Sequence, residues 1–106
     1  MIEKKKIVVS DAAPLIQLAL SHHLELLPQL YDVVIPEEVF DETQHYRELP
    51  DAMEIAKAAG KWLIVKAVKS RRQVSRLLGQ RLGEGEAEAI VLCKEIGADS
   101  LLTSDK

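Results

Sequence analysis

The sequence has almost none of the features that cross-link or anchor a protein. It contains a single cysteine, Cys93, in 106 residues. One cysteine cannot form a disulfide within the chain, and it excludes a zinc site built from several cysteines. No apolar stretch is long enough to span a bilayer, and the charged residues 1–6 are not followed by the apolar segment of a signal peptide. These absences predict a cytoplasmic protein that makes no contact with membranes.

Aromatic residues are also scarce, and glycine and proline are few. Aromatic side chains make up 4% of the residues, and the chain has five glycines and four prolines. A long Gly- or Pro-rich segment of the disordered or repetitive kind is therefore excluded. The composition is otherwise 47% apolar and 29% charged, which is typical of a folded protein. The length predicts one domain over residues 1–106.

The net charge of −3 hides an uneven distribution of charge. Residues 55–83 carry eight basic side chains and no acid, so the rest of the chain carries six basic and seventeen acidic side chains, a net charge of −11. The basic residues of this segment are Lys57, Lys61, Lys66, Lys69, Arg71, Arg72, Arg76 and Arg81. Such a segment either binds a polyanionic substrate beside an acidic pocket or is only a solvated surface. Both interpretations stay open from the sequence.

Short apolar runs alternate with segments of helical pattern along the whole chain. Parallel strands that are buried on both faces read as continuous apolar runs, and helices connect them. The fold class is therefore predicted to be α/β with a mainly parallel sheet. The predicted strands are residues 6–11, 33–35, 62–65 and 100–104, and the predicted helices are residues 14–27, a helix opened by Pro36, and residues 51–59, 68–78 and 83–96.

The first and last predicted strands end in the same way. Residues 7–11 (IVVSD) and 101–105 (LLTSD) are both apolar runs that end in a hydroxyl residue and an aspartate. Ligands of parallel α/β sheets bind at the carboxyl ends of the strands, where Asp11 and Asp105 fall. Two carboxylates brought together there repel each other unless a cation lies between them. This pattern indicates a divalent metal site.

Two further carboxylates are candidates because of their positions on helices. At about 100° per residue, Glu84, Glu88 and Glu95 fall on one side of their helix and are expected to face solvent, whereas Glu86 points the opposite way and begins the apolar face. A carboxylate there either binds a metal or simply interacts favourably with the helix N-terminus. In the helix after Pro36, Glu38 and Glu42 share a face, but any acid of this helix can also be a surface charge, so the helical pattern alone does not choose between them.

Four segments together resemble the PIN-domain nucleases, which include the VapC-type toxins of prokaryotic toxin–antitoxin pairs. They are residues 8–16 (VVSDAAPLI), 34–42 (VIPEEVFDE), 82–90 (LGEGEAEAI) and 101–105 (LLTSD), and they span nearly the whole chain. The resemblance implies a three-layer α/β/α domain. It places the family's four catalytic and metal-binding acids on Asp11, Glu42, Glu86 and Asp105, with Ser10 and Thr103 in supporting positions.

The function implied by this resemblance is a metal-dependent ribonuclease that hydrolyses RNA phosphodiester bonds as the toxin of a toxin–antitoxin pair. Carboxylate ligands without His or Cys favour Mg²⁺ or Mn²⁺. With so few aromatic residues, base stacking is not expected to dominate RNA binding. The expected partners are RNA, an antitoxin protein and a second copy of the chain. The expected RNA ligands are Lys66, Lys69, Arg71, Arg72, Arg76 and Arg81.

Relatives continue past the fourth acid with a helix and an edge strand, whereas this sequence ends at Lys106. We therefore expect a domain that lacks the C-terminal helix and edge strand, with weak metal affinity, low activity and a tendency to self-associate. The alternative is a catalytically inactive PIN-like module that binds RNA or an antitoxin. A phosphoacceptor receiver domain is a poorer match, because the paired acids of its first strand and its mid-chain aspartate are missing.

Overall fold

Four short strands form one parallel sheet at the centre of the computed structural model, which describes residues 4–104. Their order across the sheet is β3-β2-β1-β4, and each neighbouring pair is parallel. The predicted α/β fold is therefore confirmed, and the sheet is parallel throughout these residues. The strands are β1 (Lys6–Ser10), β2 (Tyr31–Pro36), β3 (Ile64–Lys66) and β4 (Ser100–Leu102).

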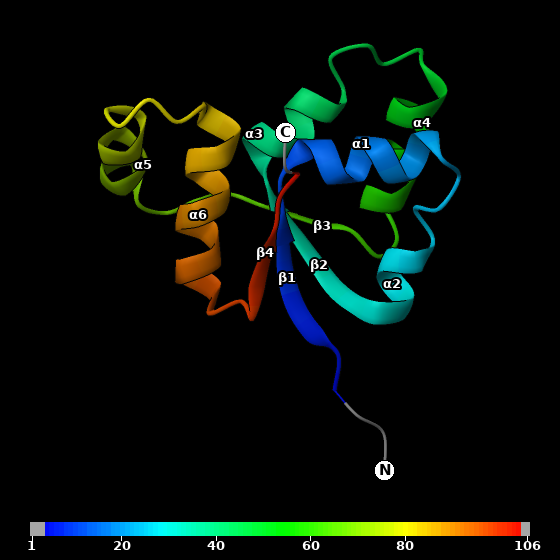
Figure 1. Ribbon diagram of the computed structural model, residues 1–106, viewed down its shortest axis with the longest axis horizontal. Coiled ribbons are helices and arrows are strands. Elements are labelled where there is room, and N and C mark those ends of the chain that lie inside the picture. The colour runs from blue at the N-terminus through cyan, green and yellow to red at the C-terminus, as the bar shows by residue number, and fades with distance from the viewer. Residues whose placement is uncertain (1–3, 105–106) are drawn as a thin grey trace.

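Within the same residues, six helices cover the two faces of this sheet unequally. They are α1 (Ala12–Leu20), α2 (Leu26–Leu30), α3 (Glu37–Thr43), α4 (Pro50–Ala59), α5 (Arg71–Leu78) and α6 (Glu84–Ile96). Figure 1 shows α1, α2 and α4 on one side of the sheet and α6 on the other, with α5 packed outside α6. This arrangement confirms the three-layer α/β/α architecture.

The order of the strands creates a switch point between β1 and β4. The chain leaves β1 to build β2 and then β3 on one side of it, and returns through α5 and α6 to place β4 on its other side. Open α/β sheets bind ligands in the crevice outside the carboxyl ends of the strands at such a point. The fold alone therefore predicts that a ligand would bind near the residues that follow β1 and β4.

The core lies between the sheet and the helices on both of its faces. Val8, Val9, Val33, Ile35 and Leu92 are all fully buried. A smaller cluster joins α5 to α6, where the buried residues are Val74, Ala87 and Val91. Because Val74 packs inward, the polar and basic residues of α5 remain at the surface.

The predicted helix over residues 14–27 is wrong. Helix α1 begins at Ala12 and ends at Leu20, and α2 begins only at Leu26. Between them His22 has a φ of 62°, in the left-handed region that a regular helix does not contain. After this turn Leu24, with 2% exposure, fills the core. Hydrophobic periodicity alone does not reveal such a break, because the residues on either side of it remain apolar.

Other predicted boundaries shift by a few residues. The helix expected over residues 68–78 begins at Arg71, because the Ser70 hydroxyl caps it by accepting from the backbone N–H of Gln73. The last strand ends at Leu102 rather than at residue 104. The end of α6 agrees with the prediction, since Gly97 follows it with a left-handed φ of 62°.

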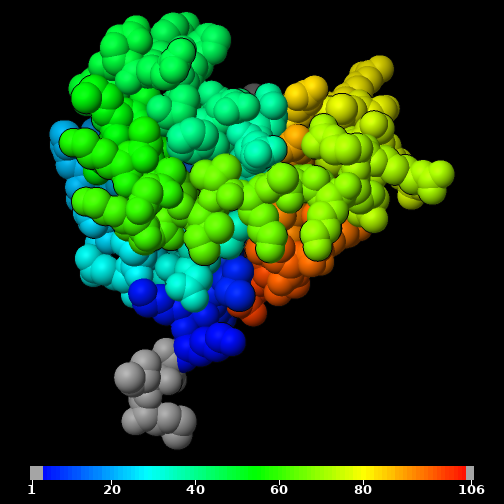
Figure 2. All heavy atoms as spheres, turned by 180° about the vertical axis from the view of Figure 1, so that it is seen from behind, coloured from blue at the N-terminus to red at the C-terminus, as the bar shows by residue number. Residues whose placement is uncertain are grey.

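The third strand begins two residues later and ends one residue later than predicted, and it forms an edge of the sheet. Trp62 precedes β3 and is half-buried against the core, whereas Ile64 and Val65 are exposed within the strand. Figure 2 shows this yellow-green segment lying uncovered between α4 and α5. The central strands β1 and β2 each have a strand on both sides. Within residues 4–104, β3 pairs only with β2, so its other edge is free of strands.

In the part of the chain that the structure describes, every helix is too short or too polar to cross a membrane.

Candidate functional site

Asp11 is held at the switch point by its neighbours in the chain and in the sheet. It is the N-cap of α1, and its Oδ1 accepts from the backbone N–H of Ala12 at 2.9 Å. Its own backbone N–H donates to the carbonyl oxygen of Leu102 at 2.9 Å, which ties it to the end of β4. Ser10 is fully buried, and its hydroxyl donates to the Asp11 carbonyl oxygen at 2.8 Å. Ser10 therefore supports the backbone of the site and does not line it.

An open cleft of about 660 Å³ lies beside Asp11, at the carboxyl ends of the strands. Three carboxylates reach it from three different elements: the cap of α1, helix α3 and helix α6. The residues that line it are Asp11, Ala13, Gln17, Glu42, Glu86, Thr103 and Ser104. The structure thus brings Asp11, Glu42, Glu86 and Thr103 together, as predicted from the sequence. Asp105, the fourth predicted acid, lies outside the described residues.

Glu42 lies among like charges in the cleft. Partial burial raises the pKa of the Glu42 carboxyl above its usual value of 4.5, and the charge of Asp11 raises it further, followed by those of Glu38 and Glu86. A backbone hydrogen bond from Gly85 acts in the opposite direction. The carboxylate of Glu42 is therefore in a cluster of like charges, and a cation in the cleft would relieve this repulsion.

The other acid of α3, Glu38, belongs to a different group of charges. Its pKa is raised by partial burial and then by the charges of Glu84, Glu88 and Asp41. It does not line the cleft, which agrees with the choice of Glu42 over Glu38 that the resemblance implies.

The donor atoms of the cleft suit a hard divalent cation. Three carboxylates and the hydroxyl of Thr103 all offer oxygen, which is the ligand type of Mg²⁺ and Mn²⁺. Within residues 4–104, no three His, Cys, Asp or Glu side chains already stand close enough together to hold an ion.

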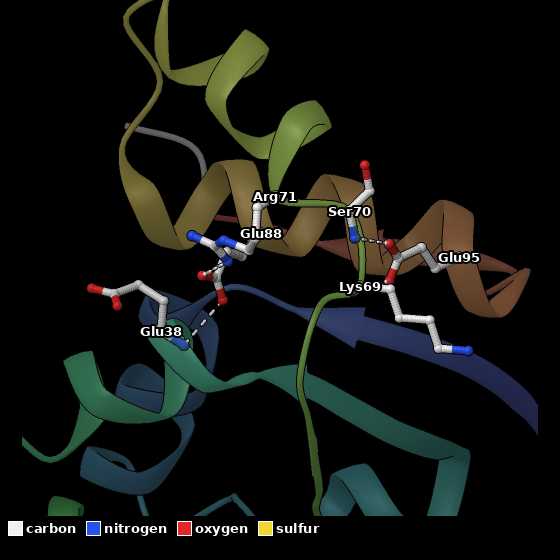
Figure 3. Close-up of polar contacts among 6 residues, drawn as sticks. All are labelled: Glu38, Lys69, Ser70, Arg71, Glu88 and Glu95. Atoms are coloured by element: carbon white, nitrogen blue, oxygen red, sulfur yellow. Dashed lines mark hydrogen bonds and ion pairs between the residues drawn. The ribbon is translucent and has the colours of Figure 1, made fainter.

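The expectation that Glu84, Glu88 and Glu95 all lie on the solvent face of α6 is wrong for Glu88, whereas Glu84 and Glu95 are exposed. Glu88 is only 6% exposed, and it accepts from Nη1 of Arg71 at 2.6 Å and from the backbone N–H of Glu38 at 3.3 Å (Figure 3). The carboxylate of Glu95 accepts from the backbone N–H groups of Lys69 and Ser70. These residues fasten the start of α5 to α6, because α5 covers the side of α6 that would otherwise face water.

Glu86 also differs from the sequence expectation, although it stays a site residue. The helical pattern predicts that it begins the buried apolar face, but its side chain is exposed and lines the open cleft. Glu86 and Glu88 do point to different sides of α6, as the helical geometry requires. Only the prediction of which side is covered is wrong.

The predicted RNA ligands are all exposed, but one of them has a structural partner. Arg71 forms the ion pair with Glu88, and this hydrogen bond raises the pKa of the Arg71 guanidinium. In residues 4–104 the other five form no ion pair. They are Lys66 on β3, Lys69 before α5, Arg72 and Arg76 on α5, and Arg81 after it.

The fold and the cleft define an α/β/α domain with a cluster of acids at the switch point of a parallel sheet. A family model described as a PIN domain matches residues 7–106 of the chain. The chain therefore belongs to the PIN-domain family, which indicates a nuclease-type function that generally depends on a divalent metal ion. The comparison with curated proteins found no match.

Gly85 contributes to the site, and the sequence patterns above do not single it out. A Cβ built on Gly85 would lie 2.1 Å from Oε1 of Glu42 and 2.9 Å from its Cδ. Only glycine therefore lets the Glu42 carboxylate rest against the first turn of α6. A glycine between two glutamates inside a helix is itself a signal of such a close approach, because glycine is otherwise unfavourable there.

We expect Gly85→Ala to reduce metal-dependent activity by about ten-fold, in the range found when a residue that orients a metal ligand is removed. The flexible Glu42 side chain will move away from the new methyl group, so the melting temperature should be unchanged or higher, since alanine favours a helix over glycine by about 1 kcal/mol. Activity and Mn²⁺ affinity would be measured beside thermal unfolding. Gly83→Ala is the matched control, because no described atom lies within 4 Å of a Cβ there. Full activity of Gly85→Ala would contradict this role.

Proposed function

We propose that this PIN domain is a ribonuclease of the VapC-like toxin branch that hydrolyses RNA phosphodiester bonds with the help of Mg²⁺ or Mn²⁺. The observation that carries the proposal is the convergence of Asp11, Glu42 and Glu86, from three elements, on one cleft at the switch point. The cleft is open, so an extended polymer can lie across it.

In this proposal the chain's own residues divide the work. Asp11, Glu42 and Glu86, together with Asp105, would hold the cation, and Thr103 would offer a hydroxyl to the attacking water or the phosphate. The bound cation would supply a more acidic water and neutralise charge on the departing oxygen. Asp11 is suited to be the fixed ligand, because the cap of α1 and the bond to Leu102 hold its backbone. Glu42 and Glu86 are longer side chains that can adjust their reach.

Cleavage of RNA with EDTA, with Mg²⁺ and with Mn²⁺ tests the function directly. We expect no cleavage in EDTA and restored cleavage with either ion. Glu42→Gln should lower activity and Mn²⁺ affinity, whereas Glu38→Gln on the same helix should not, because Glu38 lies outside the cleft. If cleavage is absent under every condition while RNA or an antitoxin still binds, an inactive binding module is the better account.

The basic segment around β3 and α5 is proposed to hold the RNA backbone. We expect the triple variant Lys66→Ala, Arg72→Ala, Arg76→Ala to weaken RNA binding for all sequences. The slope of log affinity against log salt should fall by about 0.7 for each phosphate that the variant no longer binds. Arg71 is left intact, because its removal would leave the buried Glu88 without a cation. The affinity would be measured over a range of salt concentrations.

The control for this prediction is the double variant Lys4→Ala, Lys6→Ala, which removes charges at the opposite end of β1. It should leave the slope unchanged. A triple variant with the slope of the unaltered protein would show that the basic segment is only a solvated surface.

We further propose an antitoxin protein and a second copy of the chain as partners, and the cytoplasm as the location. The exposed apolar side chains of the edge strand β3 support self-association, since uncovered edge strands tend to pair. The single cysteine, Cys93, is free, which suits a reducing compartment.

A further inference from the structure

A second hollow, of about 430 Å³, adjoins the acidic cleft on the side of the α3–α4 connection. Glu42 lines both of them, so its side chain borders the two. In Figure 1 this connection loops out beyond α3 at the same end of the molecule as the start of α1. Ile16 of α1, Thr43 of α3 and Leu49 of the connection form its apolar part.

Tyr46 gives this hollow an aromatic wall. The chain has four Phe, Trp and Tyr residues, all within residues 4–104, and Tyr46, with 60% exposure, is the only exposed one. The ring of His45 contacts it edge-on, with the ring centres 4.7 Å apart and the planes at 84°. An exposed tyrosine beside a cleft is unusual in a domain that otherwise places its aromatic side chains against the core, and the His45 contact limits the positions of its ring.

The charges of the hollow disfavour an anionic occupant. Asp51 and Glu42 line it, and among the described residues no Lys or Arg does. A phosphate or an acidic side chain would be repelled there, whereas a flat neutral ring can stack on Tyr46 and direct its N–H donors to a carboxylate. A nucleobase has both properties.

We propose that this hollow receives one unpaired nucleobase of the RNA whose phosphodiester lies in the acidic cleft, with Tyr46 as the stacking platform. The inference rests on the proposed ribonuclease function and deepens it, because it assigns a position to one base of the substrate. Bases of a duplex are already stacked and paired, and their faces are closed to a side chain. It also revises the expectation that aromatic stacking contributes little: one ring, placed next to the reacting bond, orients the substrate.

The test uses equilibrium binding, so that it does not depend on cleavage. Fluorescein-labelled oligoadenylate and an abasic oligonucleotide of the same length are titrated with the Asp11→Asn protein in Mg²⁺, and anisotropy is followed. In this background we compare Tyr46→Leu, which keeps an apolar side chain, with Tyr46→Phe, which keeps the ring, and with Leu20→Ala. Leu20 is an equally exposed apolar residue of α1, with 62% exposure, that does not line the hollow.

We expect Tyr46→Leu to weaken oligoadenylate binding by about five-fold or more, the lower end of what loss of one stacked base causes. Tyr46→Phe and Leu20→Ala should stay within about two-fold of the parent protein, since neither removes the stacking ring. Binding of the abasic strand should be the same for Tyr46→Leu and its parent. Equal weakening for the abasic and base-containing strands, or no weakening for either, would overturn the proposal. Metal-dependent cleavage by the unaltered protein, measured separately, reports on the ribonuclease function itself.

Discussion

Asp11→Asn is expected to abolish metal-dependent cleavage while the fold stays intact. Loss of a residue that merely orients a metal ligand costs about 10- to 100-fold, so loss of the ligand charge itself should cost on the order of 100-fold or more. The replacement has the same shape, and asparagine caps helices about as well as aspartate, so the bond to the backbone N–H of Ala12 can persist. The melting temperature without metal should be unchanged or slightly higher, because the substitution removes one charge from a cluster of acids that repel one another.

RNA cleavage in Mg²⁺ and Mn²⁺, together with the melting temperature in EDTA, separates the two roles that Asp11 has in the structure. Glu37→Gln, an exposed acid at the start of α3 outside the cleft, is the control for loss of one negative charge. A fall of several degrees in the melting temperature of Asp11→Asn would mean that its carboxylate is needed for the fold. The case for a metal site would then be weaker.

Glu86→Gln is expected to lower activity and Glu88→Gln to lower stability, although the two residues lie close together on α6. Glu86 lines the cleft and forms no ion pair within residues 4–104, so its substitution should lower activity by about ten-fold or more and leave stability unchanged. Glu88 is buried and receives Arg71, so Glu88→Gln should keep the activity and lose stability. Because Arg71 is exposed to solvent, the loss in the free energy of unfolding should be limited to about 1 kcal/mol. This corresponds to a fall of about 4–8 °C in the melting temperature.

Activity and stability should both be measured for both variants. Loss of activity alone indicates a metal ligand of the cleft, whereas loss of stability alone indicates a residue that holds α5 in place. Limited proteolysis near residue 70 gives a second measure for Glu88→Gln, because this carboxylate holds the beginning of α5. Equal loss of activity in the two variants would show that the orientation of α6 differs from the one described.

The α/β class could be predicted because it depends on local patterns. Runs such as residues 7–9 and 33–35 are short, β-branched and apolar at every position, which is typical of a strand covered on both faces. Helix α6 could be predicted with its C-terminus, because Gly97 follows a long periodic segment. The break after Leu20 could not be predicted. The left-handed turn at His22 depends on the burial of Leu24 and Leu27 in the core, which is a tertiary contact.

The candidate site could be predicted for the acids that follow from strand ends and helix geometry. Asp11 ends an apolar run, and the spacing of Glu86 and Glu88 places them on different sides of one helix. The sequence by itself thus determined that Asp11 ends a strand and that Glu86 and Glu88 diverge, whereas Glu42 was assigned only from the resemblance to the PIN-domain nucleases. The sequence could not determine which side of α6 is exposed, because that depends on where α5 packs, and a helical pattern contains no information about a neighbour that arrives from another part of the chain.

Tertiary structure alone decided three features of this protein. It buried Glu88 under α5 and left Glu86 open, it brought Gly85 against Glu42, and it placed Tyr46 beside the acidic cleft. Each of these depends on how separate elements of the chain pack against one another. Local sequence sets the conformation of a segment and the direction of its side chains, whereas the free energy of burying one segment against another selects which of those side chains face water.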